Sequence, residues 1–189
     1  MKNIAVVGID GSGKSTLVNA LKIKLESSNS RKVKIVRTKK ANSGLYSDIC
    51  EKYSIMPSED VKAAAFYLDL LAEYNNISEI EADYCIWDRY FYCLEAYFRA
   101  ENINIMGWVS LIRNLPEPEY IVFCDLDPSD AIKRIKYRGH LKVLETEEYL
   151  IEVRREYNRI LSDREIIYID ARKDIDYNLD VILSKLEVR

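Results

Sequence analysis

The stretch from Gly8 to Thr16 reads GIDGSGKST and constrains this chain more than any other feature. It satisfies the pattern G-x-x-x-x-G-K-[ST], follows an apolar run at Asn3–Val7 and precedes an amphipathic segment, which is the context that such a loop requires. Its glycines allow backbone N–H groups to converge on phosphate oxygens, and the start of the next helix adds a favourable dipole. The motif therefore predicts a phosphate-binding loop between a strand and a helix.

Individual side chains of this loop have predictable roles. We expect Lys14 to reach the β- and γ-phosphates of ATP, and the Ser15 hydroxyl to bind Mg²⁺. The other expected contacts to the nucleotide come from Gly8, Asp10, Gly11, Ser12, Gly13 and Thr16. The motif defines the phosphate donor and says little about the acceptor.

Short apolar segments alternate with longer amphipathic ones along the chain, a pattern typical of an α/β fold with a parallel sheet flanked by helices in three layers. The expected strands are 3–7, 33–37, 84–87, 120–126 and 166–169. The expected helices are 14–26, stretches between 47 and 81, one from 129 onward, 145–157 and 177–186, with a turn at 27–31 and a loop at 38–46. There is no internal repeat or low-complexity linker, so we expect one P-loop domain over residues 1–189.

Composition excludes several classes of protein. A formal charge of -3 disfavours nucleic acid as a partner, because phosphate backbones are bound by clustered cations. No apolar run is long enough to cross a membrane, and no secretory signal is recognisable. The single histidine, His140, disfavours a Ser-His-Asp hydrolase. Four cysteines without C-x-x-C spacing predict free, buried thiols and a cytoplasmic location; they are Cys50, Cys85, Cys93 and Cys124.

The segment Cys85–Tyr90 (CIWDRY) ends a predicted buried strand with an acid and a base. Ligands bind at this edge of open α/β sheets, so Asp88 is placed to hold the magnesium shell or accept a proton, and Arg89 to clamp a phosphoryl oxygen. A surface ion pair at a strand end is the alternative interpretation. The guanine-reading string N-K-x-D is missing from the sequence, which favours a small kinase over a GTPase.

Several ordered motifs beyond the loop resemble the thymidylate kinase family, which transfers the γ-phosphate of ATP to dTMP. Asp88–Tyr97 (DRYFYCLEAY) is similar to the family's D-R-Y segment, and Leu115–Pro118 followed by YIVFCDLDP is similar to its next strand. Ile169–Ile175 is similar to its terminal I-D-A-x-x-x-I pattern. The resemblance implies a cytoplasmic nucleotide kinase that uses ATP and Mg²⁺, has a mobile lid at about 136–148 and forms a homodimer.

The resemblance also implies roles for single residues. The catalytic set would be Lys14, Asp88, Arg89, Asp10 and Arg138, with Ser15 and Asp88 as magnesium ligands. The adenine of ATP would lie beside Arg134, Asp170 and Ala171. The acceptor would contact Arg37, Phe66, Arg89 and Tyr97. Arg37 and the lid cations Arg138, His140 and Lys142 also fit a merely solvated role.

The sequence departs from the family pattern at the acceptor site. The family's R-E-P-G-like turn reads Arg37 to Ala41 (RTKKA), and the arginine of its F-x-x-D-R segment is Leu70. Cys93 and Leu94 stand where polar groups would read thymine. Leaving a base edge unpaired costs about 1–3 kcal/mol. We therefore keep three alternatives open: dTMP or another monophosphate as acceptor, a deoxynucleoside or other small molecule, and a nucleotide-binding regulator without transfer activity.

Overall fold

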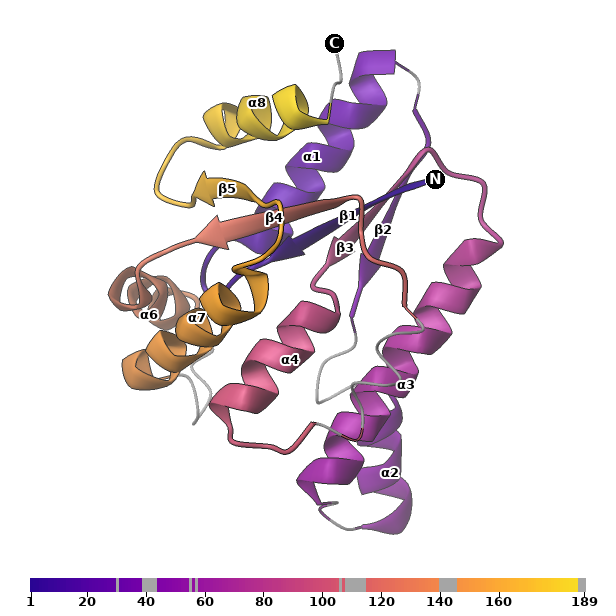
Figure 1. Cartoon of the computed structure of the whole chain (residues 1–189), viewed down its shortest axis with the longest axis vertical. Helices are drawn as coiled ribbons and strands as arrows, with labels where there is room; N and C mark the ends of the chain where they lie inside the picture. The colour runs from indigo at the N-terminus through magenta and orange to yellow at the C-terminus, as the bar shows by residue number, and fades with distance from the viewer. Residues whose placement is uncertain are drawn as a thin grey trace.

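The protein, seen here as a computed structural model, is described over residues 1–29, 31–38, 44–54, 56, 58–105, 107, 115–139 and 146–186. Five parallel strands form one sheet in the order β2-β3-β1-β4-β5 (Figure 1). Their bounds are β1 Lys2–Val7, β2 Val33–Arg37, β3 Tyr84–Asp88, β4 Tyr120–Asp125 and β5 Ile167–Asp170. The predicted α/β fold with a parallel sheet is confirmed.

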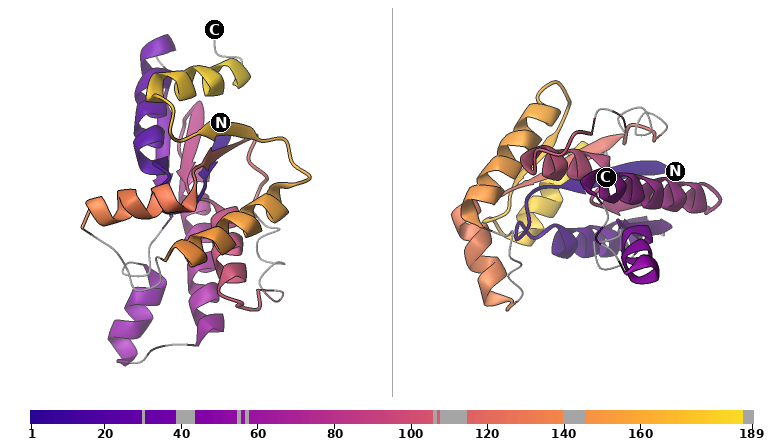
Figure 2. Two further views of the ribbon diagram at one scale, coloured as in Figure 1. Left: turned by 90° about the vertical axis from the view of Figure 1, so that its left-hand side faces the viewer. Right: turned by 90° about the horizontal axis from the view of Figure 1, so that it is seen from below.

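The sheet is covered by helices on both faces, as the right-hand view of Figure 2 shows. One apolar cluster joins α1 (Lys14–Asn29) and α8 (Ile175–Lys185) to one face of the sheet. The other cluster packs α3 (Glu59–Ser78), α4 (Phe91–Ala100) and α7 (Glu147–Leu161) on the opposite face. The three-layer arrangement follows from the strands, whose successive side chains enter different clusters and leave little polar surface in the centre.

The register of the strands brings the predicted site residues to one edge. Asp88 at the end of β3 pairs in register with Val6 of β1 and with Arg37 of β2. On the other side of β1, Asp125 and Asp170 end β4 and β5 in register with each other. Because all five strands are parallel, their carboxyl ends meet at the edge where β1 runs into the phosphate-binding loop.

Side-chain caps explain where several helices begin. In α6 (Pro128–Tyr137) the Asp127 carboxylate accepts from the backbone N–H of Ser129, and Pro128 occupies the first turn. Asp174 caps α8 in the same way, so that helix begins at Ile175, two residues before the expected start. Thr146 caps α7.

Several other expected boundaries were wrong. The helix expected at 145–157 is α7, which begins at Glu147 and ends at Leu161. The turn expected at 27–31 is partly helical, because α1 continues to Asn29 despite its serines, which favour turns only locally. The loop expected at 38–46 ends earlier, because α2 (Leu45–Tyr53) begins at Leu45, whose N–H donates to Asp69 of α3. Within the described residues, no helix combines the length and the apolar character that crossing a membrane requires.

Three of the four cysteines match the expectation of free, buried thiols, and Cys50, which is free but not buried, does not. None of the four forms a disulfide; Cys85, Cys93 and Cys124 are buried and Cys50 is partly exposed.

Candidate active site

The loop after β1 folds so tightly that two of its glycines cannot be replaced without a clash. Gly8 has φ 143°, and a Cβ there would lie 2.5 Å from the carbonyl oxygen of Cys124. Gly11 has φ 82°, and its Cβ would lie 2.7 Å from the carbonyl oxygen of Ala131. Both positions therefore require glycine, for conformation and for space. The loop's backbone is pressed against β4 and α6 and turns back into the first residue of α1.

Two polar side chains of the loop are buried and suited to an anion. The Ser12 hydroxyl is buried and has no hydrogen-bond partner within the described structure. Lys14 is 5% exposed, and its Nζ donates to the Ile9 carbonyl over 2.7 Å. Burial lowers the pKa of Lys14, the nearby Arg89 lowers it further, and Asp10 opposes the change. A phosphate group beside these donors would satisfy Ser12 and favour the charged form of Lys14. The loop thus fits a triphosphate.

Asp88, at the end of β3, lines the same cavity as the loop and can serve as a magnesium ligand. Its carboxylate is buried with the rest of the side chain at 6% exposure and lies 3.9 Å from the Arg37 Nε. Arg37 is also held by Asn19 of α1, whose Oδ1 accepts over 2.8 Å. Mg²⁺ prefers oxygen ligands and binds proteins through one or two carboxylates together with substrate phosphates. The Asp88 carboxylate and the Ser15 hydroxyl border one cavity and fit that requirement.

This cavity is the space in which the predicted residues meet. It has a volume of about 400 Å³. Its lining comes from the loop and α1, from the ends of β2 and β3, and from the end of α6: Asp10, Gly11, Gly13, Lys14, Ser15, Thr16, Arg37, Thr38, Asp88, Arg89 and Arg138. Thr38 is the one member of this set that was not predicted; it immediately follows a strand end, which was the available signal. Its hydroxyl donates to the Arg89 carbonyl over 3.1 Å.

Arg89 is tied to the loop. Its Nη2 pairs with the Asp10 carboxylate, and its guanidinium carbon lies 5.6 Å from the centre of the Tyr97 ring. The backbone of Arg89 has φ 75°, a left-handed conformation that is strained for a residue with a side chain. Burial alone would lower the pKa of Arg89, but Cys93 and Asp10 raise it well above its ordinary value. The guanidinium is therefore a permanent cation at the cavity.

Tyr97 approaches the loop from α4. Its hydroxyl accepts a hydrogen bond from the backbone N–H of Asp10 over 2.9 Å. Burial, followed by the Asp10 charge, raises the pKa of Tyr97 well above its ordinary value, so the phenol stays neutral. The structure thus brings Tyr97 into contact with Asp10 and Arg89, although Tyr97 is not among the described residues that line the cavity. Its predicted contact with the acceptor sugar stays a prediction.

The three residues predicted to lie beside adenine also gather near the loop. Arg134 Nη2 donates to the Ala171 carbonyl over 2.9 Å, and a Cβ on Gly13 would lie 3.9 Å from Arg134 Nη1. Asp170 directly precedes Ala171 and pairs with Arg172 over 2.9 Å. Two segments separated by 37 residues are therefore joined beside the phosphate-binding loop.

The expected lid is only partly described. Arg138 follows α6 and lines the cavity. Residues 140–145, with His140 and Lys142, lie outside the described residues, as do Lys39 and Lys40. The roles predicted for these residues remain predictions.

Phe66 is not among the described residues that line the cavity. Its ring stacks on Tyr46 of α2 with centroids 6.1 Å apart and planes at 19°, and it meets Phe98 at a similar distance. Leu70, one turn further along α3, is fully buried. Tyr46 was not predicted as a neighbour of Phe66, because twenty residues separate the two in sequence.

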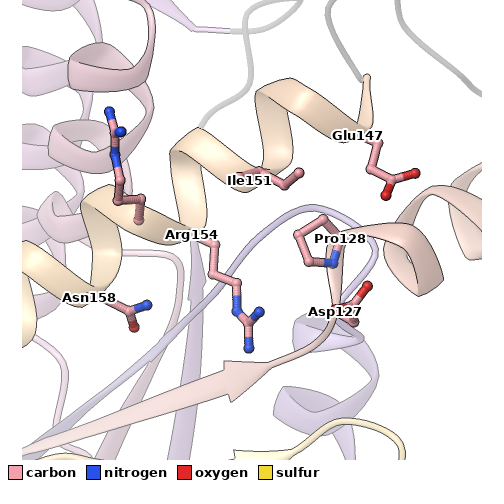
Figure 3. A pocket seen from close by; sticks show the side chains of 7 residues that line it. Asp127, Pro128, Glu147, Ile151, Arg154 and Asn158 are labelled. Atoms are coloured by element: carbon pink, nitrogen blue, oxygen red, sulfur yellow. The ribbon is translucent and has the colours of Figure 1, made fainter.

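A second hollow lies beside α7 and is separate from the predicted residues (Figure 3). It has a volume of about 320 Å³. Its lining is Asp127, Pro128, Glu147, Ile151, Arg154, Arg155 and Asn158. Figure 3 shows Arg154 extending toward the end of β4, where Nε and Nη2 each donate to the Asp125 carboxylate over 2.8 Å. This pair fixes α7 to the sheet, and none of the predicted site residues takes part.

Comparison with known protein families gives a match that includes the residues of the cavity at the phosphate-binding loop. A profile of the family described as thymidylate kinase matches residues 6–182, which include the loop, the Asp88–Arg89 pair and most of α8. The chain belongs to the thymidylate kinase family. It is 32% identical over 175 residues to a probable thymidylate kinase 1 from Saccharolobus solfataricus, which covers 92% of this chain and 90% of that protein. A thymidylate kinase from Leptospira borgpetersenii is 28% identical over 187 residues, covering 96% and 89%.

Members of the thymidylate kinase family are enzymes that use ATP, so this chain is a nucleotide kinase. Among solved structures, a deoxyadenosine kinase from M. mycoides with dCMP and dCDP bound superposes with a TM-score of 0.71 at 18% identity, covering 98% of both chains. At that identity the similarity shows the P-loop kinase fold alone.

Proposed function

We propose that this enzyme transfers the γ-phosphate of ATP to a nucleoside monophosphate, with dTMP as the first candidate. The observation that supports this most is the cavity of about 400 Å³ that Lys14 and Asp88 share with three arginines, Arg37, Arg89 and Arg138. Two phosphorylated substrates carry several negative charges into one space, and such a ring of cations neutralises them. Catalysis of phosphoryl transfer rests largely on positioning and on this neutralisation.

The part of the site that binds ATP, the phosphate donor, is formed by the loop. The backbone N–H groups between Gly8 and Thr16 and the Lys14 ammonium hold the triphosphate, and the Ser12 hydroxyl gains the partner that it lacks. Ser15 and Asp88 would hold Mg²⁺, which would supply charge neutralisation for the phosphates. The adenine would lie against Arg134, beside Asp170 and Ala171; the hydrogen bond from Arg134 to the Ala171 carbonyl supports this placement.

The acceptor half is formed by the strand ends. Arg89, directed by Asp10, and Arg37, held by Asn19, bind the acceptor phosphate. Tyr97 borders the acceptor sugar, and Arg138 neutralises charge as the phosphoryl group moves.

The identity of the acceptor base is less constrained by the described residues. Leu70 is fully buried, and one face of Phe66 is stacked on Tyr46. Neither offers a hydrogen bond to a base edge, and polar readout is what gives a site its large discrimination factors. We therefore expect dTMP to be accepted together with at least one other monophosphate.

A coupled ADP-release assay tests this function. The panel contains dTMP, dCMP, dUMP and dAMP, with thymidine and deoxyadenosine as unphosphorylated arms. We expect turnover with dTMP, at most weak turnover with nucleosides, and loss by at least about a hundredfold in Asp88→Ala. Asp180→Ala, a matched change on the exposed face of α8, should be unchanged. Turnover of nucleosides alone would assign the enzyme to nucleoside kinases, and ATP binding without any transfer would make it a regulator.

We further propose that the chain acts as a single kinase domain, as a cytoplasmic homodimer without nucleic acid. The net charge of -3 supports the absence of a nucleic-acid partner. For the homodimer, Val61 and Leu68 are 40% and 47% exposed on α3 and supply an apolar strip for a second copy. Sedimentation analysis of the wild type beside Leu68→Glu tests the dimer: the wild type should sediment as a dimer and the variant as a monomer.

A further inference from the structure

The sulfur of Cys93 receives two hydrogen bonds from side chains that are far apart in sequence. Arg89 Nη1 donates to it over 3.2 Å, and the Tyr157 hydroxyl donates to it over 2.8 Å. Cys93 is 3% exposed and Tyr157 is fully buried. A buried sulfur surrounded by apolar groups needs no donors, so two donors directed at one sulfur mark a polar connection inside the core.

This connection leads from α7 to the phosphate-binding loop. Tyr157 belongs to α7, Cys93 to the first turn of α4, and Arg89 to the short link between β3 and α4. From Arg89 the chain of contacts continues to the Asp10 carboxylate. Four side chains from four parts of the sequence are thus joined in series.

The contacts restrict the Arg89 guanidinium from different sides. Asp10 holds Nη2, Cys93 holds Nη1, and the Tyr97 ring covers one region of the planar group at 5.6 Å. A planar guanidinium that is held at both terminal nitrogens cannot rotate. Its remaining N–H donors therefore point in one fixed direction. The Asp10 contact alone would leave the group free to pivot about the Nη2 end.

We propose that Cys93 and Tyr157 are positioning residues, which set the orientation of Arg89 toward the acceptor phosphate. The inference rests on the proposed role of Arg89 in holding that phosphate. In this arrangement the Cys93 sulfur uses its capacity as a hydrogen-bond acceptor inside the protein and does not read the acceptor base. Tyr157 acts through Cys93, because its hydroxyl donates to the Cys93 sulfur and so holds the sulfur in place.

Variants of the two residues separate positioning from packing. Cys93→Ser keeps an atom that accepts from both donors. Cys93→Ala removes that atom, so the fully buried Tyr157 hydroxyl and the Arg89 Nη1 both lose their acceptor at this position. Cys85→Ala is the matched control, because Cys85 is equally buried on β3 in the same apolar cluster. Tyr67→Phe is the matched control for Tyr157→Phe, because the Tyr67 hydroxyl is buried and has no partner in the described structure.

The kinetic readout is the KM for the best acceptor of the panel compared with the KM for ATP. We expect Cys93→Ala to raise the acceptor KM about five- to tenfold, with the ATP KM changed less than about twofold. Tyr157→Phe should raise the acceptor KM about two- to threefold, and Cys93→Ser should stay within about twofold of the wild type. The double variant Cys93→Ala/Tyr157→Phe should match Cys93→Ala, because both act through the same sulfur.

The proposal is overturned if Cys93→Ala resembles Cys85→Ala in acceptor KM, if both substrates are affected equally, or if the double variant shows the product of the single effects. A second readout does not depend on activity. In ¹⁵N NMR of the guanidinium groups, hindered rotation of Arg89 in the wild type should become faster in Cys93→Ala and not in Cys85→Ala. If the wild type phosphorylates nothing in the panel, the proposed function fails, and unchanged rotation of Arg89 in Cys93→Ala would still refute the positioning role by itself.

Discussion

The backbone N–H of Asp10 donates a hydrogen bond to the hydroxyl of Tyr97 over 2.9 Å. The carboxylate of the same Asp10 holds Arg89, and the Arg89 guanidinium lies over the Tyr97 ring. Three residues therefore close a ring of contacts between the phosphate-binding loop and α4. This ring links the part of the site proposed for ATP to the part proposed for the acceptor.

Removing the Tyr97 hydroxyl should loosen the loop. In Tyr97→Phe the Asp10 N–H loses its acceptor, so we expect the free energy of unfolding to fall by about 1–3 kcal/mol. Urea denaturation measures the change. Tyr67→Phe, which deletes a buried hydroxyl without a partner, should be as stable as the wild type or more stable. Equal losses in the two variants would contradict the role assigned to the Asp10–Tyr97 bond.

Ser12→Ala should separate stability from binding. Because the Ser12 hydroxyl is buried without a partner, its removal should leave the stability of the ligand-free protein unchanged or raise it by up to about 1 kcal/mol. Affinity for ATP should fall about fivefold, as expected for one lost hydrogen bond to phosphate. Calorimetry with ATP measures the affinity, and thermal unfolding without ATP measures the stability of the ligand-free protein. Ser184→Ala on α8 is the control, and a Ser12→Ala variant that binds ATP normally would remove Ser12 from the phosphate site.

Stability should depend on Asp170 at low pH. Side-chain and backbone hydrogen bonds from Arg172 lower the pKa of Asp170 from 3.8 to about 2. A carboxyl group whose pKa is lower in the folded state stabilises the fold above its unfolded pKa, and this contribution is lost as the pH falls from about 4 toward 2. Urea titrations over that range should show a shallower loss for Asp170→Asn than for the wild type. Asp180→Asn should follow the wild type; identical curves for all three would refute the shift.

Thiol reactivity should single out Cys50. Burial raises the pKa of Cys85 and of Cys124 to about 12, so both stay protonated, and Cys93 is buried as well. We expect an aromatic disulfide reagent to modify one of the four thiols quickly in the native protein and all four in denaturant. Cys50→Ala should abolish the fast phase. A fast reaction that persists in this variant would show that a buried thiol is accessible.

The strands were well predicted from the sequence because burial between two helical layers demands continuous apolar runs. The expected strand 33–37 coincides with β2, and Tyr84–Asp88 extends the expected strand by one residue. Helix ends were harder to predict. The serines after Glu26 indicated a turn, but α1 continues to Asn29. The helix packs with α8, a contact that no local pattern encodes.

The cavity lining was largely predictable and its supporting contacts were not. Lys14 and Asp88 follow from motifs, because a phosphate loop and a strand end have fixed places in this fold. The pairing of Tyr157 with Cys93 joins residues 64 positions apart, and no local pattern indicates that the two side chains meet. The same holds for Tyr46, which appeared to end a loop and instead stacks on Phe66.

The attachment of α2 has an evolutionary consequence. This helix packs mainly on α3, through the Tyr46–Phe66 stack and the bond between the Leu45 N–H and Asp69. Lys14 and Asp88, by contrast, are embedded between β1, β3 and α1. Mutations that accumulate in α2 can therefore alter the surroundings of Phe66 while the phosphate machinery is inherited intact. With Phe66 at the acceptor, as proposed, such mutations would change the choice of acceptor and leave the phosphate-binding residues in place.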